Sequence, residues 1–103
     1  VEEYRRHTAF FGCVTGRFAN RIAGGVVRLD GEEYVLPINN FPGGVGCHLH
    51  GGEAGFNTKE WEVDRVDAGG DSPGIVFRRR SPDGGEGYAG SLECGIGSGG
   101  IGA

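Results

Sequence analysis

Turn-forming residues interrupt this chain so often that they leave little room for a long helix. Glycine occupies 23 of the 103 positions, and a glycine inside a helix or strand costs about 0.5–1 kcal/mol relative to alanine. No apolar pattern with the period of an α-helix persists through three turns, and short apolar runs lie between turn residues instead. The sequence therefore predicts an all-β fold, and its length predicts at most one small domain.

The clearest local structure is a hairpin formed by residues 26–29 and 32–36. Asp30 and Gly31 join these runs, and an Asp-Gly pair suits a type I′ turn because both central residues take positive φ. We expect a second hairpin over residues 60–81, with its turn at residues 68–73, followed by a short strand near residues 88–94. The remaining residues, to 103, are rich in glycine and predict no regular structure.

Charge and apolar patterning exclude two classes of partner. The net charge of −4 argues against nucleic-acid binding, and the only basic run, residues 78–80, is expected to be a solvated strand end. No apolar stretch is long enough to span a membrane. Cys13, Cys47 and Cys94 match no zinc or redox spacing, and their odd number favours reduced thiols and a cytoplasmic location.

Two polar clusters are the candidate functional residues. Arg17, Asn20 and Arg21 form the first, and an Arg–Asn pair can donate to and accept from neighbouring sugar hydroxyls. Capping of turns and surface ion pairing are the alternative interpretation of these three residues. The second cluster contains His48 and His50, and the two would share one face if both lay on a strand.

Three interpretations of the two histidines are open. With Cys47 they could hold a metal, but no fourth ligand presents itself, so we predict no metal. A single imidazole could instead hydrogen-bond a ligand oxygen or donate a proton near neutral pH. A purely structural histidine is the third interpretation. The glycines that follow, Gly51 and Gly52, leave space for close approach of backbone or ligand.

Two further motifs are discounted. Residues 95–100 fit G-x-G-x-x-G, but a dinucleotide site also needs a following helix, and this chain has so many glycines that chance matches are expected. Asp83 and Glu86 lie in a turn, where two carboxylates are too few for a calcium site. We therefore predict no cofactor.

Several segments, taken in order, resemble the aldose 1-epimerases, also called galactose mutarotases. The sequence GRFANRIA at residues 16–23 is similar to the family's GR-x-ANRIA block, and LDGEEYVL at residues 29–36 is similar to its LDG-x-x-Y-x-L hairpin. LHGG at residues 49–52 and SPDGGEGYAG at residues 81–90 are similar to two further blocks. Taken in order, the matching segments extend the resemblance over most of residues 4–92.

The resemblance implies part of a large β-sandwich that binds an aldohexose in an open cleft and interconverts its α and β anomers. It places Asn20 and Arg21 on the family's substrate-binding pair and His50 on its first substrate-contacting histidine, and it implies no metal or nucleotide. The general-acid histidine and general-base glutamate belong to later blocks that do not occur here, and nothing around Glu86 or Glu93 matches them. We therefore expect no catalytic residue among the 103 and little activity from this chain alone.

The departures from the family pattern define the expected domains. Ala89 stands where proline is usual, the loop at residues 41–48 is longer than the family's, and the expected strand after Leu92 becomes glycine-rich. We expect residues 1–92 to be a partial epimerase domain from the N-terminal half of a longer protein. Residues 93–103 are expected to be a non-native or disordered tail. The alternative function is that of a non-catalytic carbohydrate-binding module of the same fold.

Overall fold

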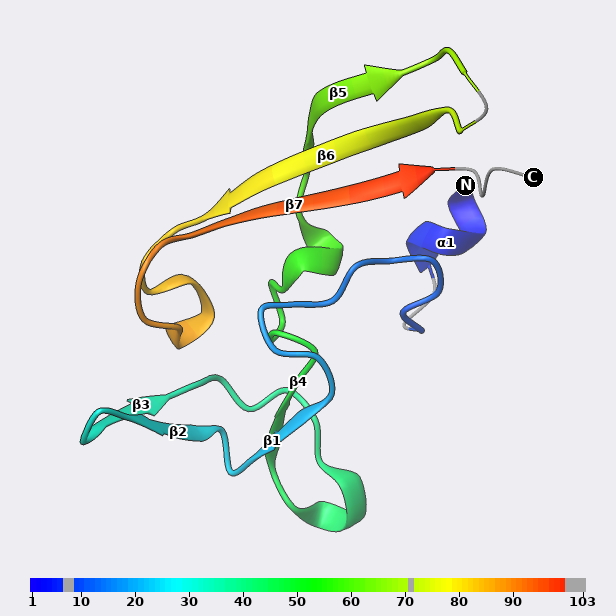
Figure 1. Cartoon of the computed structure of the whole chain (residues 1–103). Helices are drawn as coiled ribbons and strands as arrows, with labels where there is room; N and C mark the ends of the chain where they lie inside the picture. Colours follow the sequence, from blue (N-terminus) through cyan, green and yellow to red (C-terminus); the bar gives the residue numbers. More distant parts are fainter. Residues whose placement is uncertain (7–8, 71, 100–103) are drawn as a thin grey trace. The chain divides into compact units, whose positions relative to one another are not determined.

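The computed structural model describes residues 1–6, 9–70 and 72–99, and these are mostly in strands and turns (Figure 1). They form two compact units, one of residues 1–59 with 86–88 and the other of residues 60–85 with 89–103. None of the helices in the described ranges is long and apolar enough to cross a membrane. The elements are α1 (Glu2–Arg6), β1 (Arg21–Ala23), β2 (Val26–Leu29), β3 (Glu32–Val35), β4 (Cys47–Leu49), β5 (Glu62–Asp67), β6 (Gly74–Ser81) and β7 (Leu92–Gly99), with 3-10 turns at Pro42–Gly44, Phe56–Thr58 and Gly85–Gly87.

In the first unit, β2 and β3 form the hairpin predicted from the sequence. Val27 pairs with Tyr34 and Leu29 with Glu32, and Asp30 and Gly31 both take positive φ in the turn. A second antiparallel pair joins β1 to β4, which are distant in sequence, with Arg21 opposite Leu49. The ends of β1 and β4 therefore bring the two polar clusters to one place.

A small buried cluster supports these two strand pairs. Leu36 is 2% exposed, Cys47 is 4% exposed and His48 is fully buried. The backbone N–H of Leu36 donates to the carbonyl of Gly25 at 2.7 Å, which continues the hairpin beyond β3. Gly87 packs against Leu36, since a Cβ at Gly87 would lie 3.1 Å from the Leu36 Cδ2. The later segment 86–88 is thus part of this unit.

The second unit is a three-stranded antiparallel sheet in the order β5-β6-β7. Val63, Phe77 and Ile96 lie opposite one another across the three strands, so they share a face. This confirms the predicted hairpin over residues 60–81, except that Asp71 of its turn lies outside the described residues. A bulge between Val63 and Arg65 shifts the register of β5.

Two elements differ from the sequence expectation. The helix α1 was not expected, and it has no buried residues; Glu2 forms ion pairs with Arg5 at 3.6 Å and Arg6 at 3.8 Å, which support one turn. The strand β7 continues to Gly99, where an irregular tail was expected, because β6 pairs with all of it. Residues 100–103 lie outside the described residues. The assignment of residues 93–103 to a separate tail stays a prediction.

Candidate functional site

Asn20 and His50 form a reciprocal pair where β1 begins and β4 ends. The backbone N–H of Asn20 donates to the His50 Nδ1 at 2.9 Å, and the backbone N–H of His50 donates to the Asn20 carbonyl, also at 2.9 Å. Both residues have positive φ, 63° and 50°. Because Nδ1 accepts a hydrogen bond, the proton of a neutral His50 ring resides on Nε2. Nε2–H is then a donor for an incoming oxygen atom.

Arg21 lies beside this pair and is oriented by two asparagine side chains. Its Nε donates to the Asn40 Oδ1 at 3.0 Å, and its Nη1 donates to the Asn20 Oδ1 at 3.3 Å. Arg21 is exposed, and these two bonds leave the Nη2 end of its fork available. The structure therefore brings together the three residues Asn20, Arg21 and His50, which the sequence analysis had selected.

His48 differs from His50 in its position, its burial and its hydrogen-bond partners. β4 ends at Leu49 and His50 lies beyond it with positive φ, so the two histidines do not both lie on a strand, which was the condition for sharing one face. The His48 Nδ1 lies 2.7 Å from the Pro37 carbonyl oxygen and its Nε2 lies 2.8 Å from the Tyr88 hydroxyl. A carbonyl can only accept, so Nδ1 donates and Nε2 accepts from the tyrosine.

These bonds leave no ring nitrogen of His48 for a metal ion. Among residues 1–6, 9–70 and 72–99, no group of three or more histidine, cysteine or acidic side chains is placed to hold one. Cys47, the third member of the possible metal group, contacts the Asn40 Oδ1 through its thiol at 3.4 Å. His48 thus fits the structural interpretation.

Sequence reasoning missed the segment Glu86–Tyr88. The Glu86 carboxylate accepts a short hydrogen bond from the backbone N–H of Ala54, and Glu86 itself has a positive φ of 50°. The guanidinium carbon of Arg17 lies 5.7 Å from the centre of the Tyr88 ring, within cation–π range. The only available signal was the family-like EGY triplet, which gives no indication of these partners.

Burial raises the pKa of Tyr88 above its ordinary value of 10.0. A hydrogen bond with the Phe18 backbone and the charge of Arg17 lower this pKa, whereas the charge of Glu86 raises it. The neutral phenol is therefore favoured in the folded chain. Its stabilising effect is complete below about pH 10 and is lost as the pH rises through the folded pKa.

We expect the phenolate absorbance of the folded chain, minus that of Tyr88→Phe, to rise above pH 10. An ultraviolet titration of both proteins, repeated in denaturant, measures this difference. A transition at the same pH in folded and unfolded chain would contradict the burial argument.

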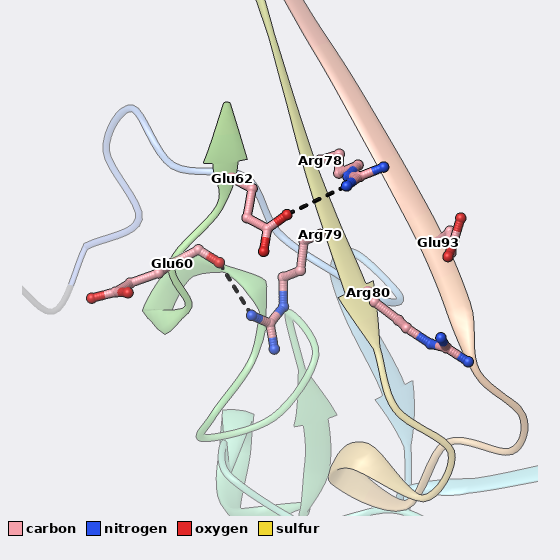
Figure 2. A pocket seen from close by; sticks show the side chains of 6 residues that line it. All are labelled: Glu60, Glu62, Arg78, Arg79, Arg80 and Glu93. Atoms are coloured by element: carbon pink, nitrogen blue, oxygen red, sulfur yellow. Dashed lines mark hydrogen bonds and ion pairs between the residues drawn. The ribbon is translucent and has the colours of Figure 1, made fainter. Parts of the chain in front are cut away.

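The second unit contains a separate pocket of about 330 Å³ at the end of its sheet where β5 begins (Figure 2). Three arginines and three glutamates line it, so its formal charges cancel: Arg78, Arg79, Arg80, Glu60, Glu62 and Glu93. Arg78 pairs with Glu62 at 3.6 Å, and the Arg79 Nη1 donates to the Glu60 carbonyl at 3.2 Å. Among the described residues, the Arg79 Nε is buried without a hydrogen-bond partner. This pocket carries no defined chemistry.

Comparison with known proteins identifies similar chains. A family model described as aldose 1-epimerase matches residues 1–97. The galactose mutarotase of Sus scrofa is 50% identical over 93 residues, which are 90% of this chain and 25% of that protein.

Solved structures give the same result. The crystal structure of galactose 1-epimerase from Lactobacillus acidophilus has a TM-score of 0.79 at 26% identity, covering 95% of this chain and 28% of that one. An aldose epimerase homologue from C. elegans has a TM-score of 0.76 at 30% identity, covering 94% of this chain and 27% of that one. The chain thus spans about a quarter of the length of the curated relatives it matches.

Proposed function

The chain belongs to the aldose 1-epimerase family, and on that premise we propose that Asn20, Arg21 and His50 hold an aldohexose. The protein to which the chain contributes would interconvert the α and β anomers of that sugar, as the names of its relatives indicate. In this proposal the chain supplies groups that bind the sugar ring. The proton-transferring histidine and glutamate implied by the resemblance belong to other segments.

The observation that carries this proposal is the pairing of Asn20 with His50. It leaves Nε2–H as the ring donor of a neutral His50, while Arg21 beside it keeps guanidinium donors available. Sugar hydroxyls accept from both kinds of donor, and two donors held by neighbouring strands can bond two neighbouring hydroxyls. The absence of an acidic partner on Arg21 among the described residues keeps its charge available for those bonds.

The reduced state of the cysteines supports a cytoplasmic location for this activity. Cys13, Cys47 and Cys94 are all free thiols. The proposed small-molecule partner is an aldohexose.

We expect D-galactose to shift the backbone amide signals of Asn20 and Arg21 and the ring signals of His50 in NMR titrations of the 103-residue chain. Arg21→Gln should weaken this binding about tenfold or more, because hydrogen bonds from a charged donor contribute about 1.5–3 kcal/mol. Arg28→Gln is the matched control, since Arg28 is exposed in the same unit and pairs with Glu33 at 3.1 Å.

Equal binding by Arg21→Gln and wild type, or galactose shifts confined to other residues, would count against the proposed site. Binding lost equally in both arginine variants would indicate a non-specific charge effect and contradict the proposal as well.

A further inference from the structure

The segment Glu86–Tyr88 contacts both parts of the chain that carry the candidate site. The Tyr88 ring lies under the Arg17 guanidinium, three residues before Asn20, and its hydroxyl bonds to His48, two residues before His50. Glu86 accepts from the backbone N–H of Ala54, on the other side of His50 in sequence. One short segment therefore contacts the stretches of chain next to both Asn20 and His50.

Gly52 is the point where these contacts reach the turn after His50. A Cβ at Gly52 would lie 2.8 Å from the Glu86 Cδ and 2.9 Å from the His48 Cε1. Gly52 thus packs closely against both the Glu86 carboxylate and the His48 ring. We therefore expect a change at either side chain to shift the backbone of Gly52, two residues after His50.

In its neutral form, His48 bonds to both partners as a single tautomer. Its Nδ1 must donate to the Pro37 carbonyl, which leaves Nε2 bare to accept the tyrosine proton. The ring is fully buried, so the loss of either bond would leave a buried ring nitrogen without that partner. The two histidines of this site therefore carry their protons on opposite nitrogens: His48 on Nδ1 and His50 on Nε2.

We propose that His48 and Tyr88 are a pair of positioning residues that fix the His50 imidazole, and through it the hexose, without touching the sugar themselves. The sugar part of this statement rests on the proposed function; the positioning of His50 does not. Neither residue was selected from the sequence for this role, and His48, on β4, belongs to the segment 41–48 in which the chain departs from the family pattern.

The wild-type chain provides the first test. Long-range ¹H–¹⁵N spectra of the imidazoles at about pH 8, where an ordinary imidazole is neutral, distinguish the two tautomers. We expect His48 as the Nδ1–H form and His50 as the Nε2–H form, with signals assigned by their loss in His48→Gln and His50→Gln. An Nε2–H form of His48 would overturn the proposal whether or not any variant folds.

Tyr88→Phe provides the second test, because it removes the hydroxyl and keeps the ring under Arg17. We expect it to shift the His50 ring and Asn20 amide signals and to weaken galactose binding about tenfold, the lower end of the 10–100-fold effects of supporting residues at metal sites. Tyr34→Phe is the control: it removes an exposed hydroxyl that bonds to Glu32 at 2.8 Å. Unchanged His50 and Asn20 signals in Tyr88→Phe would overturn the proposal.

Replacement of His48 separates positioning from simple packing. His48→Gln offers an oxygen that can accept from Tyr88, whereas His48→Leu fills the space without one. We expect the His50 signals of His48→Gln to lie closer to wild type than those of His48→Leu; the reverse order would contradict the proposal. If galactose fails to bind the wild type while Tyr88→Phe still shifts His50, the positioning role stands and the sugar site falls.

Discussion

Gly51→Ala is expected to unfold the first unit of the chain. Gly51 has a φ of 89°, and a Cβ there would overlap the carbonyl group of Gly16. That carbonyl cannot retreat, because it already accepts from the backbone N–H of Phe56 at 3.2 Å and also lies against Gly55. Backbone strain and overpacking cost about 1–3 kcal/mol each, and a core this small supplies about 3–5 kcal/mol.

Urea unfolding followed by the NMR signals of residues 20–50 measures this effect. Gly31→Ala is the matched control, because Gly31 also has a positive φ of 79° but a Cβ there meets nothing within 4 Å. It should cost only the conformational part, about 1 kcal/mol. Similar losses in the two variants would show that the close approach of Gly51 to Gly16 is unimportant.

The contact between Gly51 and Gly16 joins segments distant in sequence, and such contacts could not be predicted from the sequence, whereas local structure could. The hairpin around Asp30 and Gly31 is local, so its turn chemistry was enough to predict it. The continuation of β7 beyond the predicted strand near residues 88–94 was not predicted because its glycines weaken any local preference, and it is ordered by pairing with β6. Pairing between segments distant in sequence has no local signal.

The same distinction applies to the site. Asn20 and Arg21 are neighbours in sequence, and their grouping with His50 followed from the resemblance rather than from spacing. The bond from Tyr88 to His48 joins residues 40 positions apart, and a positive φ is uncommon for a glutamate such as Glu86. No periodicity could have predicted either feature, so the support of the site became visible only in three dimensions.

Leu36→Ala is expected to have the second large effect. Leu36 is 2% exposed and lies between the β2–β3 hairpin and Gly87, whose ideal Cβ would be 3.1 Å from its Cδ2. Truncation of a buried leucine to alanine costs about 2–5 kcal/mol, which equals the stability that a unit of this size can hold. Urea unfolding, followed through the amide signals of β2 and β3, measures the loss. Leu29→Ala, in the same hairpin but 54% exposed, should cost less than about 0.5 kcal/mol.

The position of Leu36 also predicts where in the first unit the Leu36→Ala variant loosens first. Because Leu36 supports Gly87, its truncation should loosen the neighbouring residues Glu86 and Tyr88 before the hairpin itself opens. Hydrogen exchange at Tyr88, Asn20 and His50 should therefore accelerate together in Leu36→Ala, and by more than exchange at the β2–β3 amides. Faster exchange in the hairpin alone would mean that the segment 86–88 holds the site independently of the core. Concerted acceleration would show that the small buried cluster, the Glu86–Tyr88 segment and the Asn20–His50 pair form one cooperative structure.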